Sequence, residues 1–238
     1  MGNYIVLFEI VSLFTNIPLN ESIELAVDLI YAKDSSIKMS KAQMRKLFHF
    51  ATAQTHFTYN NQYYDQVDGV AMGSPLGPVL ANLFMSNFEK TWLAEHNGTE
   101  YSPIFYKRYV DDIFCIMKSK ELVSKCLLEL NTRHKNIQFT VEEEEHGVLP
   151  FLDILIKRTE DMTFTTTTYR KPTNTGLLTN FTSFTNFVYK IGLVRTLTER
   201  AFKINSSKEL LDNDLGKISE TLQKNMFPRK VIEQVISG

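Results

Sequence analysis

The order of predicted elements in this sequence indicates an α+β protein. An apolar run over residues 4–14 predicts a buried strand, and two helices, a hairpin and a third helix follow it. Short strands at 105–110 and 113–117 then lead into a further helix and more strands. This order is typical of a split-βαβ, ferredoxin-like arrangement, in which helices cover one face of an antiparallel sheet. Beyond residue 172 the pattern becomes mainly helical.

Local signals support the elements of the first half. Asn20 is expected to cap a helix that runs to about residue 33, because acidic residues follow it in the first turn. Ser40 and Gln43 have the spacing of a capping box, which predicts a helix from there to about residue 54. Residues 56–66 alternate like a hairpin that turns at 60–62.

The later elements follow from hydrophobic periodicity and from the placement of Gly and Pro. The acidic run 142–145 is interpreted as a solvated turn rather than a metal site. The remaining predictions are helices at 79–95 and 118–133, strands at 137–141, 150–156 and 163–169, and helices at 184–206, 207–224 and 228–236.

Composition and charge narrow the class of protein. The 238 residues are 43% hydrophobic, which argues against disorder. The two cysteines lack the spacing of a zinc site, and no apolar run reaches the roughly 18 residues of a membrane span, so an intracellular protein is expected. Residues 1–150 hold 13 Lys/Arg and 18 Asp/Glu, whereas residues 169–208 hold seven basic residues and one acid. This division suits an enzyme that binds metal in one part and phosphate backbone in the other.

The segment Tyr109-Val110-Asp111-Asp112 is expected at the tip of a hairpin with buried arms. Two adjacent carboxylates repel one another, a cost that is offset where a divalent cation lies between them and a third acid. Mg²⁺ prefers oxygen ligands, and phosphoryl transfer uses two such ions. A solvated Asp-Asp turn is the alternative.

A Gly/Pro-rich loop over residues 69–78 runs directly into a predicted helix. Its glycines let the backbone approach a bulky partner, and a helix N-terminus suits a phosphate or template contact. A tight loop with no ligand is the alternative.

Five segments of the sequence occur in the order found in reverse transcriptases, and their residues most resemble those of Penelope-like retroelements. The later stretch 186–197 also resembles the thumb side of that family. The five segments are 10–19, 69–78, 109–112, 149–154 and 169–173.

The resemblance implies an RNA-directed DNA polymerase with a palm over residues 1–172 and a truncated helical thumb over 173–238. Its partners would be an RNA template, a DNA primer and deoxynucleotide triphosphates, with no membrane, and its location the nucleus, although no targeting signal is seen. The cofactor would be Mg²⁺, with Mn²⁺ as the alternative ion.

The resemblance also implies roles for single residues. Asp111 would be the principal metal ligand and Asp112 a weaker one, joined by Glu9 and the carbonyl of Ile10. Phe14 would exclude a 2′-hydroxyl, or else be an ordinary core residue. Gly73, Ser74 and Pro75 would contact the incoming nucleotide and the template. The residues that would bind the phosphates of primer and template are Arg170, Lys171, Lys190, Arg195 and Lys203. For Lys190, Arg195 and Lys203 the alternative is a solvated helix face.

Two departures from the family put activity in doubt. The family places aspartate where this chain has Glu9, whose carboxylate lies about 1 Å further out, and such a displacement can cost ~10²-fold in rate. The first motif also begins within ten residues of Met1, which predicts a truncation that removes the fingers. The alternative function is therefore a catalytically inactive, nucleic-acid-binding remnant of such an element.

Overall fold

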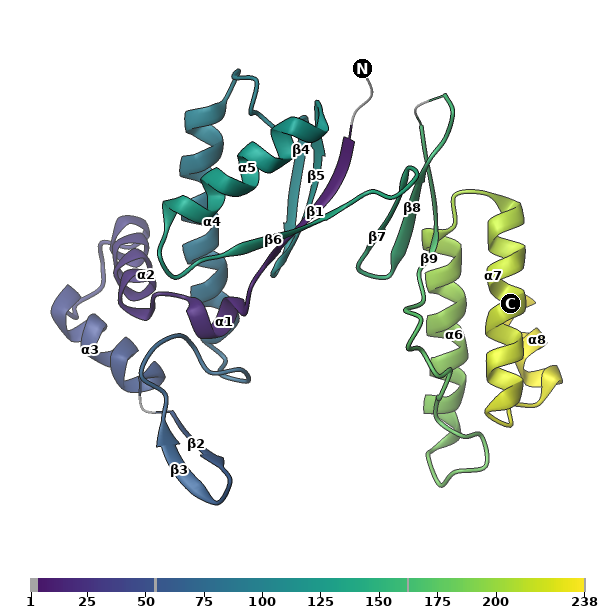
Figure 1. The fold of residues 1–238 in the computed structure, drawn as a ribbon. Helices are drawn as coiled ribbons and strands as arrows, with labels where there is room; N and C mark the ends of the chain where they lie inside the picture. The colour runs from purple at the N-terminus through teal and green to yellow at the C-terminus, as the bar shows by residue number, and fades with distance from the viewer. Residues whose placement is uncertain (1–3, 54, 162, 238) are drawn as a thin grey trace. The chain divides into compact units, whose positions relative to one another are not determined.

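The fold is described from a computed structural model, which covers residues 4–53, 55–161 and 163–237 (Figure 1). The chain divides into two compact units, residues 1–143 and residues 144–238. The domain boundary predicted at residue 172 stays a prediction.

A four-stranded antiparallel sheet forms the centre of the first unit. Its strands are β1 (Tyr4–Ile10), β4 (Phe105–Tyr109), β5 (Asp112–Met117) and β6 (Phe139–Glu143), in the order β4-β5-β1-β6. The strand predicted at 4–14 ends at Ile10, because a short helix α1 (Leu13–Asn16) begins soon afterwards. The first strand in the sequence therefore lies inside the sheet, between β5 and β6.

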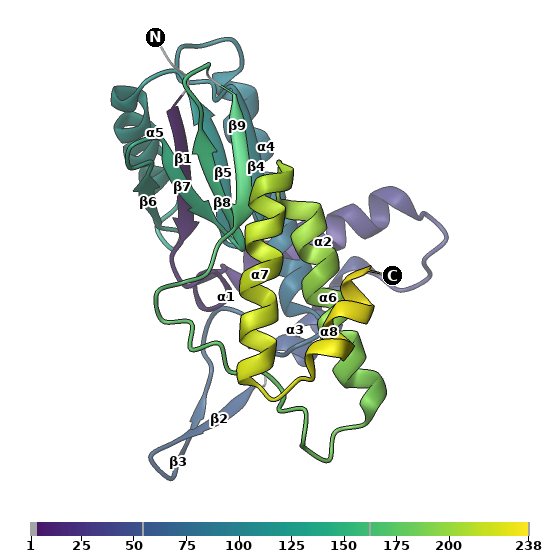
Figure 2. The same cartoon turned by 90° about the vertical axis from the view of Figure 1, so that its right-hand side faces the viewer.

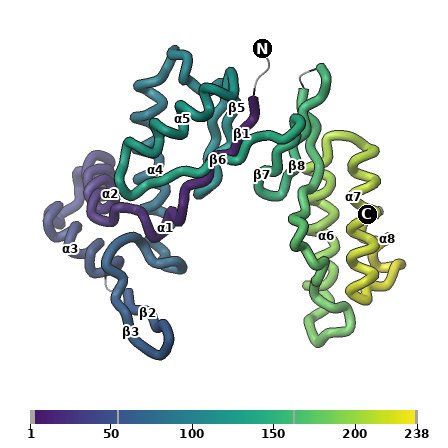
Figure 3. The backbone as a smooth tube through the Cα atoms, viewed as in Figure 1, coloured from purple at the N-terminus to yellow at the C-terminus, as the bar shows by residue number. Residues whose placement is uncertain are grey.

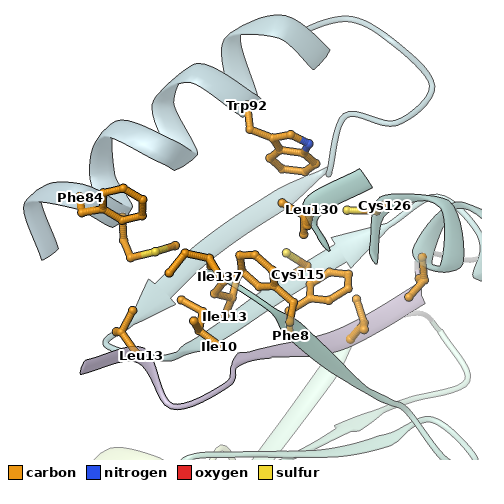
Figure 4. Packing of buried hydrophobic residues seen from close by; sticks show 14 of the residues in the cluster. Phe8, Ile10, Leu13, Phe84, Trp92, Ile113, Cys115, Cys126, Leu130 and Ile137 are labelled. Atoms are coloured by element: carbon orange, nitrogen blue, oxygen red, sulfur yellow. The ribbon is translucent and has the colours of Figure 1, made fainter. Parts of the chain in front are cut away.

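Two helices cover one face of this sheet and bury its apolar side chains. They are α4 (Gly77–His96) and α5 (Lys120–Arg133). Figure 4 shows Trp92 and Phe84 of α4 facing sheet residues such as Phe8 and Ile113. Helix α4 is long because its apolar residues recur at helical spacing and pack into this core. Pro78 fits its first turn.

The rest of the first unit consists of α2 (Leu19–Lys33), α3 (Lys41–Thr52) and the hairpin β2 (His56–Tyr59) and β3 (Gln62–Asp65), whose path Figure 3 follows. The predicted capping box of Ser40 and Gln43 is confirmed. The predicted cap at Asn20 is wrong, because the N-cap of α2 is Pro18. Asn60 and Asn61 both have positive φ, the conformation that a two-residue hairpin turn requires.

The second unit contains a three-stranded antiparallel sheet and three helices. The strands are β7 (Val148–Phe151), β8 (Ile154–Arg158) and β9 (Phe164–Thr168). In Figure 2, α6 (Phe187–Ile204) and α7 (Lys208–Lys224) run side by side, and α8 (Arg229–Ser237) packs with them through a small apolar cluster.

Two predictions in this unit are wrong in detail. The single strand predicted at 150–156 is two strands, because Leu152 adopts a positive φ of 54° and turns the chain between them. The acidic run is not fully solvated either, since Glu144 is buried and pairs with Arg158. No helix in the described part of the chain is long and apolar enough to cross a membrane.

Candidate active site

The paired aspartates lie at the tip of the β4–β5 hairpin, as predicted. The prediction that both arms are buried is wrong, because β4 is an edge strand with no buried residue. Tyr109 and Asp112 are the last paired residues of the two strands, so Val110 and Asp111 form the turn. Val110 has a φ of 56°, which is rare for a β-branched residue and costs on the order of 1–3 kcal/mol. Such strain persists only where the surrounding structure holds it, and it gathers at functional sites.

The strand β1 brings Glu9 to the same place. Glu9 is the cross-strand partner of Asp112, and side chains directly opposite one another in an antiparallel pair share one face of the sheet. The next residue, Ile10, donates its N–H to the carbonyl oxygen of Asp111 at 2.9 Å. The backbone therefore gathers three acids at one end of the sheet, and Glu9 and Asp112 lie on the face that α4 and α5 do not cover.

The carboxylates of these three residues have the chemistry that a hard divalent cation requires. The arrangement of their side chains supports a metal site less well. Carboxylate oxygens are the ligands that Mg²⁺ prefers. Within residues 4–53, 55–161 and 163–237, however, no group of three His, Cys, Asp or Glu side chains is arranged to hold a metal ion. The metal site predicted at Glu9, Ile10, Asp111 and Asp112 is thus supported by backbone register and stays a prediction.

An open groove of about 700 Å³ adjoins the hairpin tip. Its wall is mainly apolar and includes Phe14, Pro78, Val79, Tyr109 and Val110. Phe14 also packs against two apolar clusters, so its side chain contacts the core as well as lining the groove. Its predicted role in excluding a 2′-hydroxyl stays untested.

The first residues of the Gly/Pro-rich loop pack against α1. Gly69 has a φ of 74°, and a Cβ there would lie 2.4 Å from the carbonyl oxygen of Thr15. The next residue, Val70, donates its N–H to the carbonyl of Phe14 at 2.7 Å. The three predicted nucleotide contacts lie further along the loop and do not line the groove beside Phe14: Gly73 and Pro75 are exposed and Ser74 is half-buried.

A buried arginine beside the paired aspartates is the main residue that sequence reasoning missed. The side chain of Arg108 is 8% exposed and pairs with Glu89 of α4, Nε to Oε1, at 2.6 Å. Its other two nitrogens donate to the Val110 carbonyl and to Asn82 Oδ1, each at 3.0 Å. One signal was available: Arg108 alternates with Tyr109 along β4, which places it on the inward face, where a charge requires a partner.

The basic residues predicted to bind phosphate lie in the second unit and differ in their surroundings. Lys171, Arg195 and Lys203 are exposed. Lys190 is 7% exposed, and its ammonium donates to the carbonyls of Phe181 and Ser183. Phosphate binding is therefore not supported for Lys190, because both contacts tie it to its own fold.

Arg170 is partly exposed and pairs with Asp214 at 2.6 Å. Burial disfavours the charged form of Asp214, but hydrogen bonds from Thr168 and Asn205 and the pairing with Arg170 outweigh it, so the pKa of Asp214 lies below its ordinary value. A cavity of about 350 Å³ is lined by Arg170, Lys171 and Arg200 among others. Arg200, which also pairs with Asp153 at 3.0 Å, was not predicted as a site residue.

Solved structures similar to this chain include two telomerases and a viral RNA-dependent RNA polymerase. A Candida albicans telomerase in complex with a telomeric RNA fragment matches with 11% identity and a TM-score of 0.64, over 94% of this chain and 41% of that one. The apo telomerase of Candida tropicalis matches with 14% identity and a TM-score of 0.52, over 98% and 42%. A sicinivirus RNA-dependent RNA polymerase matches with 11% identity and a TM-score of 0.52, over 100% and 52%.

At these identities the similarity concerns the fold alone. This chain thus has a mixed α/β polymerase fold with antiparallel sheets, and it spans about two fifths to one half of the length of those proteins. No curated protein matches.

Family models match both parts of the chain. Residues 177–237 match an animal helix-turn-helix domain. Residues 2–146, more than half of the chain and including the β4–β5 hairpin, match the reverse transcriptase (RNA-dependent DNA polymerase) family. The chain therefore belongs to the reverse transcriptase family.

Proposed function

We propose that this chain is the palm and a helical, thumb-like part of an RNA-directed DNA polymerase from a Penelope-like retrotransposon. The single observation that carries the proposal is the register of Glu9 opposite Asp112, beside Asp111 in the strained turn. The strand order β4-β5-β1-β6 supports a ferredoxin-like palm, since it is the order of a split βαβ sheet. The Penelope-like assignment and a nuclear location rest on the resemblance of the sequence motifs.

In the proposed reaction, the 3′-hydroxyl oxygen of a DNA primer attacks the α-phosphorus of a deoxynucleotide triphosphate. A new phosphorus–oxygen bond forms, the bond to the β-phosphate breaks, pyrophosphate leaves and the hydroxyl proton passes to solvent. Glu9, Asp111 and Asp112 would hold Mg²⁺ or Mn²⁺, which when bound supplies charge stabilisation for phosphoryl transfer.

The protein's remaining contribution to this reaction is binding and orientation. Phe14 lies beside the hairpin tip, where its ring would limit the space at the sugar of the nucleotide. The exposed Lys171, Arg195 and Lys203 would neutralise phosphates of the RNA template and DNA primer.

The test is extension of a DNA primer annealed to an RNA template by the full chain, with Mg²⁺ or Mn²⁺ and deoxynucleotide triphosphates. Extension is expected to require the ion and to disappear in Asp111→Asn, which keeps the size of the side chain and removes its charge. The matched control is Asp212→Asn, at an exposed aspartate of α7. Extension that survives Asp111→Asn would overturn the proposal.

The second candidate function is nucleic-acid binding without catalysis. Glu9 in place of aspartate favours it, as does the absence of a converged metal cluster from the described residues. Binding of an RNA–DNA duplex with no extension under either ion would establish this function instead.

A further inference from the structure

We infer that Arg108 is a positioning residue that fixes the backbone of Asp111 from the helix side of the sheet. The effect of Arg108 on catalysis rests on the proposed polymerase function. The restraint of the Asp111 backbone rests on contacts of the described residues. Arg108 reaches two side chains of α4 and the turn of the β4–β5 hairpin at the same time.

Arg108 contacts the turn at the carbonyl oxygen of Val110, directly before Asp111. Arg108 Nη1 donates to the carbonyl oxygen of Val110 at 3.0 Å, and that carbonyl belongs to the peptide group that precedes Asp111. The peptide group that follows Asp111 is held separately, because its carbonyl oxygen accepts from the N–H of Ile10 at 2.9 Å. The backbone of Asp111 is therefore restrained on both sides, by a strand on one and by Arg108 on the other.

The arginine is itself held firmly. Glu89 and Asn82 lie two turns apart on α4, so both face β4, and each binds a different nitrogen of the guanidinium group. The hydroxyl of Tyr106 donates to the same Glu89 oxygen at 2.8 Å. Because the side chains of Arg108 and Glu89 are 8% and 12% exposed, solvent competes little for the bond between them, whereas the bonds to Asn82 and Val110 border the open groove.

The peptide group between Val110 and Asp111, whose carbonyl Arg108 binds, sets ψ of Val110 and φ of Asp111. A bond from Arg108 to the Val110 carbonyl favours the orientation of that peptide group over its flipped alternative. Lysine cannot replace this geometry, because its single ammonium lacks the planar fork that contacts Glu89, Asn82 and the turn together.

The first experiment compares primer extension by Arg108→Lys with that by Arg45→Lys in the full chain. Arg45 forms a more exposed pair with Glu24, also at 2.6 Å, and serves as the matched control. Arg108→Lys is expected to lower kcat by ~10²-fold, the effect of a displaced catalytic group, with KM for the nucleotide within about threefold. Arg45→Lys is expected to leave both constants unchanged.

A double-mutant cycle separates positioning from general stability. Asn82→Ala is expected to lower kcat in the wild-type background and to have little further effect in Arg108→Lys, since it acts through the arginine. Additive losses, or losses that follow the unfolded fraction measured by circular dichroism, would overturn the inference.

A readout without activity keeps the inference distinct from the proposed function. Backbone ¹⁵N relaxation dispersion is expected to show microsecond-to-millisecond exchange at residues 110–112 in Arg108→Lys and not in Arg45→Lys. Unchanged relaxation in Arg108→Lys would overturn the positioning role, whether or not the chain extends primers. New exchange in a chain that never extends primers would refute the polymerase function and leave the restraint of Asp111 established.

Discussion

Replacing Gly69 with alanine should destabilise the first unit far more than the same change at Gly73. Both glycines have positive φ, at 74° and 93°. A side chain in that conformation costs about 1–2 kcal/mol, and the stiffer unfolded chain offsets about 0.4–1 kcal/mol of it. Gly73→Ala should therefore cost about 1 kcal/mol, because nothing lies within 4 Å of the added Cβ.

At Gly69 two further costs apply. The new Cβ would lie 2.4 Å from the Thr15 carbonyl oxygen, so the loop must move, with a strain of about 1–3 kcal/mol. That movement would break the hydrogen bond from Val70 to Phe14, worth about 1 kcal/mol. The expected total for Gly69→Ala is about 4 kcal/mol.

Urea unfolding followed by tryptophan fluorescence measures this difference. Trp92 is the single tryptophan of the chain and is buried in the core of the first unit, so its emission reports that unit. With a slope of about 2 kcal/mol per molar urea, the two midpoints should differ by roughly 1.5 M. Midpoints within about 0.5 M of each other would refute the close packing of the loop on α1.

Three further predictions concern the site and the stability of the two units. Glu9→Asp should raise kcat for primer extension by up to ~10²-fold by shortening the reach of the carboxylate, and an unchanged kcat would show that Glu9 is not limiting. Asp214→Ala should cost about 3 kcal/mol at neutral pH, as chemical denaturation would show, because the carboxylate stabilises Arg170 and two hydrogen-bond donors. Since the folded-state pKa of Asp214 is lowered, its contribution is present above about pH 4 and is lost as the pH falls through the folded-state value, so the difference between wild type and Asp214→Ala should shrink in acid. Burial raises the pKa of Cys115 well above its ordinary value and that of Cys126 to about 12, so neither thiol should react with iodoacetamide at pH 8 until urea unfolds the chain.

Local signals in the sequence predicted most of the elements because they are carried by neighbouring residues. The capping box of Ser40 and Gln43 and the asparagine turn of the β2–β3 hairpin are examples. The positive φ of Leu152 was not predictable in the same way. Leucine has no preference for that conformation, which the two-residue turn of the β7–β8 hairpin imposes although no Gly or Asn marks it in the sequence.

The candidate site was predictable as a set of residues but not as an arrangement. The motifs identified Asp111 and Glu9, and the sheet register brings them to one end. Whether a charged side chain faces solvent or the core depends on contacts that sequence spacing does not contain. Lys190 and Arg108 illustrate this, since one was expected at the surface and the other was overlooked, and both are buried by partners elsewhere in the chain.

The position of β1 has a consequence for biosynthesis. It is synthesised before the other strands of its sheet, yet one edge pairs with β5 and the other with β6, whose last residue is Glu143. A nascent chain that has not reached Phe139 therefore exposes an unpaired, strongly apolar strand edge, and such edges invite aggregation. We expect the first unit to acquire protease resistance in a single late step, once Glu143 has emerged from the ribosome.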